Sequence, residues 1–149
     1  MTMELLATPE EVMRSVEELE KFGRNHGIAE KDLFAARLAL EECGSNIVNY
    51  ALRRNERLTF TVTIQLIGSN LTLELRDSGP EFDPTDFRKI EPRDDDTVGG
   101  WGLELVRRSM DEFHYRREGS ENILMLTKVV QTDKSQSNLK PSITKTYGS

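Results

Sequence analysis

Apolar and polar side chains alternate along two neighbouring runs, residues 58–67 and 71–76, and Gly68, Ser69 and Asn70 separate these runs. Successive side chains of a β-strand point to opposite faces, so this period of two predicts two strands with one apolar face each. A short turn of small and polar residues joins such strands into an antiparallel hairpin. The alternation therefore predicts a sheet with one face buried and the other face in water.

Two helices should cover the buried face of this sheet. Thr8 is a suitable N-cap for a helix over residues 9–25, with Pro9 at its first position and Gly27 just beyond its end. A second helix should run over residues 30–54. Its apolar side is formed by residues at helical spacing, which are Leu33, Ala36, Leu40, Ile47 and Ala51.

The remaining elements complete a two-layer fold. A third helix should begin at Leu103, and further strands are expected over residues 3–7, 112–117 and 123–130. This order predicts an α/β two-layer sandwich, in which helices pack on one face of a mainly antiparallel, mixed sheet.

Domain organisation follows from the same pattern. We expect one domain over residues 1–130. The polar, aperiodic residues 131–149 should form a disordered tail.

Composition and charge exclude several classes of protein. The chain has 149 residues and a net charge of −6, whereas a nucleic-acid binder usually presents a basic face. It has neither a run of roughly 20 apolar residues that could cross a membrane nor the basic start of a secretion signal. The single cysteine, Cys43, lies in an apolar helical pattern and should be buried. We expect a cytoplasmic protein that binds neither nucleic acid nor membrane.

Three short motifs carry groups that suit binding or chemistry. In the first, Glu42 and Asn46 are four residues apart on the second helix, so their side chains meet on one helix face. A carboxylate can take a proton from a nucleophile, and an amide oxygen is a ligand that suits Mg²⁺. Taken alone, the pair is more typical of a solvated helix face.

The second motif is Asp77 with Gly79, at the point where an apolar strand leaves the sheet. A carboxylate there can accept a hydrogen bond from an exocyclic amine such as that of adenine, and glycine permits a close backbone approach. An ordinary strand-ending turn has the same composition, so the motif alone leaves both interpretations open.

The third motif contains Gly99, Gly100 and Gly102, and it leads straight into the helix expected from Leu103. Glycines before a helix N-terminus expose backbone N–H groups beside the positive end of the helix dipole, which favours phosphate. A hinge or a tight turn is the alternative.

The order and spacing of the three motifs resemble the Bergerat-type ATP-binding fold of the GHKL superfamily, over residues 8–130. Within that superfamily the chain is most similar to the anti-sigma factor serine kinases of the RsbW and SpoIIAB type. The segments that carry this resemblance are LALEECGSNIVNYA, DSGPEFDP and GGWGLELVRRSMDEFHYRREGSENILMLTK.

The resemblance implies a role for each matching residue. Glu42 would be the general base that activates a serine hydroxyl of a partner protein. Asn46 would hold Mg²⁺ between the phosphates of ATP. Asp77 would bind the adenine amine, and Gly79 would let the base approach.

The glycine motif would hold the other end of the nucleotide. The resemblance implies that Gly99, Gly100 and Gly102 contact the phosphates and that Leu103 packs below them. Residues 83–98 would form a lid over ATP.

The resemblance also implies partners. The chain would be a homodimer that sequesters a sigma factor and phosphorylates a STAS-domain anti-anti-sigma protein. Two alternatives share the site: an ATP-binding regulatory module that sequesters a partner without catalysis, and a detached histidine-kinase-like catalytic domain. A domain that binds no nucleotide is the remaining possibility.

Overall fold

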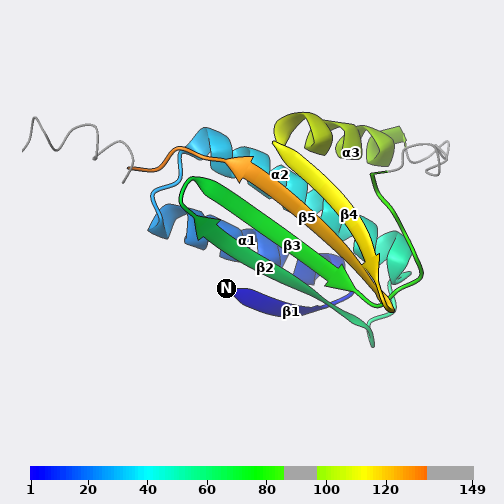
Figure 1. Cartoon of the computed structure of the whole chain (residues 1–149). Helices are drawn as coiled ribbons and strands as arrows, with labels where there is room; N and C mark the ends of the chain where they lie inside the picture. The colour runs from blue at the N-terminus through cyan, green and yellow to red at the C-terminus, as the bar shows by residue number, and fades with distance from the viewer. Residues whose placement is uncertain (86–96, 134–149) are drawn as a thin grey trace, which may run out of the picture.

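A computed structural model describes residues 1–85 and 97–133 of the chain, with side chains from residue 102 onward in the second range (Figure 1). The chain forms, in order, β1 (Thr2–Leu6), α1 (Pro9–Asn25), α2 (Glu30–Asn46), the π-helix η1 (Ile47–Ala51), β2 (Thr59–Ile67), β3 (Asn70–Asp77), α3 (Thr97–Ser109), β4 (Glu112–Glu118) and β5 (Glu121–Val129).

The five strands form one sheet in the order β1-β2-β3-β5-β4. All four pairings between these strands are antiparallel, so the sheet is antiparallel throughout rather than mixed. The helices lie on one face of the sheet (Figure 1). The predicted two-layer α/β sandwich is confirmed. β5 lies between β3 and β4 and runs antiparallel to β3. The start of β5 therefore lies beside the end of β3, where Asn122 pairs with Asp77.

The core fills the space between the sheet and the helices. The predicted hairpin supplies much of it, and Phe60, Ile64, Leu71, Leu73 and Leu75 are all fully buried. Burial of a side chain of this size contributes about 1.5–3 kcal/mol relative to exposure.

The start of α1 is as predicted, since the Thr8 hydroxyl accepts a hydrogen bond from the Glu11 amide at 3.2 Å. A capping bond of this kind stabilises a helix end by about 1 kcal/mol.

The second helix ends earlier than predicted. The α-helix stops at Asn46 and continues as η1, in which the Leu52 amide bonds to the carbonyl of Ile47, five residues earlier, at 2.8 Å. Arg53 and Arg54 then adopt positive φ angles and reverse the chain. The predicted extension to residue 54 is therefore wrong. The apolar spacing did not reveal the change, because Ile47 and Ala51 are buried in the π-helix as they would be in an α-helix.

The third helix begins six residues earlier than predicted. It starts at Thr97, so Gly99, Gly100 and Gly102 lie inside its first two turns rather than before it. Each glycine costs about 1 kcal/mol in a helix interior, which is why the sequence placed the boundary after them. The buried side chains of Leu103 and Val106 anchor the helix to the rest of the molecule, and this packing outweighs the local preference.

The chain after β5 folds against the loop between α1 and α2. The Ala29 amide bonds to the carbonyl of Gln131 at 2.8 Å, the Gln131 amide to the Asp32 carboxylate at 2.8 Å, and the Asp133 amide to the carbonyl of Gly27 at 2.8 Å. The fold thus extends to Asp133, three residues past the predicted domain boundary. The rest of the predicted tail lies outside the described residues. Within the described ranges, no helix is both long and apolar enough to cross a bilayer.

Candidate functional site

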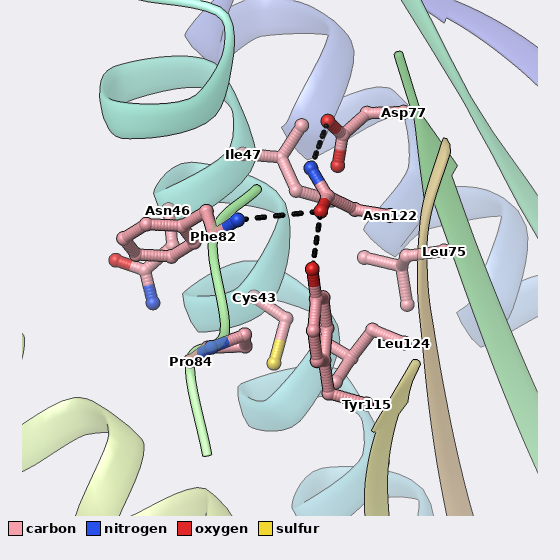
Figure 2. Close-up of a pocket in the computed structure, with 10 residues that line it drawn as sticks. All are labelled: Cys43, Asn46, Ile47, Leu75, Asp77, Phe82, Pro84, Tyr115, Asn122 and Leu124. Carbon is pink, nitrogen blue, oxygen red and sulfur yellow. Dashed lines mark hydrogen bonds between the residues drawn. The ribbon is translucent and has the colours of Figure 1, made fainter. Parts of the chain in front are cut away.

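A pocket opens between α2, η1 and the neighbouring ends of β3 and β5 (Figure 2). The cavity itself is about 10 Å³, room for roughly one water molecule, and the space reaches about 270 Å³ only when the open solvent at its mouth is counted. Two of the predicted site residues, Asn46 and Asp77, line it, together with Cys43, Ile47, Leu75, Phe82, Pro84, Tyr115, Asn122 and Leu124. Mostly apolar walls with a few polar groups suit a flat ring system such as a nucleobase.

Asp77 lies at the floor of this pocket and is 4% exposed. One carboxylate oxygen, Oδ1, accepts hydrogen bonds from the Gly79 amide and from Asn122 Nδ2, both at 2.9 Å. No donor among the described residues bonds to Oδ2. Burial raises the pKa of Asp77, and the bonds from Asn122 and Gly79 oppose the rise. Asp77 can therefore offer one free acceptor to the amine of a ligand.

Gly79 lies where no larger residue would fit. A β-carbon at this position would be 2.6 Å from the carbonyl oxygen of Ala51 in η1 and 3.0 Å from Asp77 Oδ1. Real Cβ atoms do not approach backbone this closely. The glycine thus allows the turn after β3 to lie directly against η1, beside the carboxylate of Asp77.

Asn46 is buried beside the pocket, at 7% exposure. Its Nδ2 has no hydrogen-bond partner among the described residues. A buried polar group left unsatisfied costs about 1–3 kcal/mol, so a ligand that met it would stabilise the site. The two ends of an amide are assigned from their surroundings, so either end of Asn46 can face such a ligand.

Glu42 lies on α2 one helical turn before Asn46, as predicted. Its side chain is half-buried, and its pKa is raised, first by burial and second by the negative charge of Glu41. Its carboxylate lies so close to Gly102 that a β-carbon there would overlap it. α3 is thus packed onto the candidate base, and Leu103 beside Gly102 is 2% exposed.

Gly99 and Gly100 lie in the first turn of α3. The N–H groups of a first helical turn have no partner inside the helix and are available to an anion. The structure therefore brings Gly102 against Glu42. For Gly99 and Gly100 it gives only the position of the backbone, in the first turn of α3. The predicted lid, residues 83–98, falls largely outside the described residues.

The sequence did not single out Asn122, which is 4% exposed at the start of β5. Its amide connects the floor of the pocket to two neighbouring segments (Figure 2). Nδ2 donates to Asp77 Oδ1 at 2.9 Å and to the carbonyl of Pro80 at 2.8 Å. Oδ1 accepts from the Phe82 amide at 3.3 Å, the Tyr115 hydroxyl at 2.5 Å and Arg117 at 3.1 Å. One signal was available, since Asn122 is in phase with the buried residues Leu124 and Leu126.

Comparison with known proteins identifies the fold and the family. The profile of the family described as "Histidine kinase-like ATPase domain" matches residues 5–128. The chain belongs to this family. The resemblance to the GHKL superfamily that the three motifs predict is thereby confirmed.

One relative of the chain is named as a kinase. The chain is 31% identical over 111 residues to "Serine/threonine-protein kinase BtrW" of Bordetella bronchiseptica, covering 67% of this chain and 77% of the relative.

Solved structures of histidine kinase-like ATPase folds superpose on the chain. The RsbU and RsbW domains of a Mycobacterium tuberculosis protein superpose with a TM-score of 0.59 at 17% identity, over 87% of this chain and 32% of that one. The SiaB–SiaC complex of Pseudomonas aeruginosa gives a TM-score of 0.63 at 12% identity, over 85% of this chain and 88% of the matched chain. At these identities the likeness concerns the fold.

Proposed function

We propose that the chain is an ATP-dependent protein serine kinase of the anti-sigma factor type. It binds Mg-ATP in the pocket, sequesters a sigma factor and phosphorylates a serine of a STAS-domain anti-anti-sigma protein. The family match and the kinase relative support this proposal. The strongest support is one observation: the carboxylate of Glu42 lies one helical turn from Asn46 and against Gly102 of α3.

We place the adenine end of ATP at the floor of the pocket, whose walls must move apart to admit the ring. Asp77 Oδ2 is the acceptor for the exocyclic amine, since Oδ1 is already bonded twice. Ile47 and Leu124 provide apolar walls for the ring. Gly79 keeps a side chain out of the space beside Asp77.

We place the phosphate end between Asn46 on α2 and the start of α3. The unpartnered atom of Asn46 is Nδ2, a donor, so the amide would be turned over for its oxygen to take one coordination position of Mg²⁺. Bound Mg²⁺ would neutralise charge on the phosphates, and most of its ligands would be phosphate oxygens and water. In this proposal the N–H groups of Gly99 and Gly100 bind the phosphates, Gly102 lets α3 lie against Glu42, and the buried Leu103 packs below them.

Glu42 takes the proton from the serine hydroxyl of the partner. Its raised pKa makes it a stronger base than an ordinary glutamate, which favours proton transfer near neutral pH. The contact with Gly102 occupies the space beside its carboxylate. The first turns of α3 must therefore shift before a hydroxyl can reach Glu42.

The same contact favours a second candidate function. With Gly102 packed on Glu42, the chain could bind ATP and sequester a partner without transferring phosphate. Such a module would need Asp77 and Asn46 but not the carboxylate of Glu42.

A phosphotransfer assay separates these functions. The chain is incubated with labelled ATP, Mg²⁺ and a candidate STAS-domain protein, and the wild type is compared with Glu42→Ala. Glu18→Ala, which removes a partly exposed carboxylate of α1 that pairs with Lys21, is the matched control. The kinase proposal requires acid-stable label on the acceptor for the wild type and the control, and loss of about 100-fold or more for Glu42→Ala.

Each other outcome points to one alternative. Equal labelling by Glu42→Ala would remove Glu42 from the mechanism. ATP binding without transfer would favour the silent module, and acid-labile label would favour a histidine-kinase-like activity.

We also propose that the chain acts as a homodimer in the cytoplasm. Sedimentation over a tenfold range of concentration should give twice the monomer mass. A monomer throughout would contradict the dimer.

A further inference from the structure

The orientation of the Asn122 amide is fixed by its surroundings. Three donors converge on Oδ1, from the Phe82 backbone and from the side chains of Tyr115 and Arg117. Turning the amide over would place Nδ2 against the Phe82 amide and Arg117, neither of which can accept, and lose both of those bonds, whereas the Tyr115 hydroxyl could accept instead. The donor end of Asn122 must therefore face Asp77 and the carbonyl of Pro80.

This orientation determines which part of Asp77 a ligand meets. Oδ1 receives N–H donors from two directions, Gly79 and Asn122, which holds the carboxylate in one rotamer. Arg117 adds a bond of 2.7 Å to the carbonyl of Gly79, so the turn that carries one of these donors is fixed as well. Oδ2 is then the one oxygen of Asp77 without a donor among the described residues.

We propose that Asn122 is the positioning residue that makes the pocket selective for the nucleobase. By holding Asp77 with Oδ2 as a pure acceptor, it favours a purine that carries an exocyclic amine and disfavours a purine that carries a carbonyl oxygen at the same position. The proposal rests on the proposed function, because it requires the base to lie at Asp77. Tyr115 supports the same arrangement by bonding to the acceptor end of Asn122.

ATP and ITP form the matching pair of ligands, because they differ in this amine and carbonyl and share the sugar and phosphates. A site built to bond a donor group rejects an analogue that lacks it by a large factor. The wild type should therefore bind Mg-ATP roughly 100-fold or more tightly than Mg-ITP. Isothermal titration calorimetry measures both dissociation constants and their ratio.

Two substitutions of Asn122 test its role. Asn122→Asp keeps the three accepted bonds and replaces the donor by an oxygen facing Asp77 Oδ1, so the two carboxylates repel each other or share a proton. Asn122→Leu removes both ends of the amide. We expect each variant to bind ATP at least about tenfold more weakly and to lower the ATP-to-ITP ratio by about tenfold or more. Gln65→Glu, the same amide-to-acid change on the exposed face of β2, should leave both constants unchanged.

Tyr115→Phe is the milder variant, for use if the Asn122 variants fail to fold in thermal melts. It removes one of the three donors to Oδ1 and should lower the ratio by about threefold. If the variants that fold weaken ATP and ITP by the same factor, Asn122 has a structural role only and the inference is overturned. If the wild type binds neither nucleotide, the proposed function itself fails.

Discussion

The carboxylate of Glu42 fills the space that a β-carbon at Gly102 would need. This contact joins α2 to α3 and leaves Glu42 half-buried, which raises its pKa. The contact therefore links the candidate base directly to the helix whose first turn carries the candidate phosphate-binding glycines.

Gly102→Ala should destabilise the fold by about 1–3 kcal/mol, because the added methyl group and the carboxylate of Glu42 cannot both fit. Combining it with Glu42→Ala removes the clash, so the two changes should couple by about 1 kcal/mol or more. Denaturant unfolding of the four proteins of this cycle measures the coupling. The better helix propensity of alanine cancels in the cycle. Effects that simply add would show that Gly102 does not rest on Glu42.

Glu41→Gln should shift the pH dependence of phosphotransfer. Burial and, second to it, the charge of Glu41 raise the pKa of Glu42 above the ordinary 4.5, and only ionised Glu42 can act as a base. As the pH is lowered, phosphotransfer activity should therefore begin to fall at a higher pH than it would with an ordinary glutamate as the base. Removing Glu41 lowers the pKa of Glu42 and should move this acidic limb to lower pH. Single-turnover rates between pH 4.5 and 8 measure the limb, with Glu18→Gln as control. Superimposable wild-type and Glu41→Gln profiles would refute the coupling.

Asp77→Asn should weaken ATP binding and also change how the stability of the fold depends on pH. Loss of the charged acceptor should weaken ATP binding by about 10- to 100-fold. Folding raises the pKa of Asp77 above 3.8, so the unfolded chain ionises first. The wild type therefore loses stability as the pH rises through 3.8 toward the folded pKa, and the asparagine variant escapes this loss.

Unfolding in denaturant at pH 3 and at pH 7 tests the sign of this effect. The free energy of unfolding of Asp77→Asn should rise relative to that of the wild type from pH 3 to pH 7. A variant that does not gain stability relative to the wild type from pH 3 to pH 7 would show that burial of the Asp77 charge does not limit stability.

Cys43 should resist thiol reagents in the native protein. It is 1% exposed, and burial followed by the charge of Glu42 raises the pKa of its thiol, so little reactive thiolate is present. Labelling by a maleimide should proceed only through unfolding, and Mg-ATP should slow it further because Cys43 lines the pocket. Rapid labelling of the folded protein would contradict the described packing.

The sequence predicted the parts of the fold that depend on local pattern. The alternation over residues 58–76 required a hairpin, and Thr8 with Pro9 marked the start of α1. It also predicted that Glu42 and Asn46 share a helix face, because a spacing of four within a helix has one geometric result. These features need no knowledge of distant contacts.

The features that the sequence missed depend on tertiary contacts. The π-helix η1 has the same apolar spacing as an α-helix, and only its hydrogen bonds distinguish it. The start of α3 at Thr97 goes against the helix propensity of glycine. Asn122 acquires its role from strand register, since the pairing of β3 with β5 brings it to Asp77 across 45 residues of sequence.

Asn46 and Asp77 are proposed to belong to one Mg-ATP site. Calorimetric titration of the full chain with ATP, first with Mg²⁺ and then with EDTA, tests this proposal. We expect one ATP per chain with Mg²⁺, weaker binding in EDTA, and loss of most of this Mg²⁺ dependence in Asn46→Ala. Absence of ATP binding by the wild type, or the same Mg²⁺ dependence in Asn46→Ala, would contradict it.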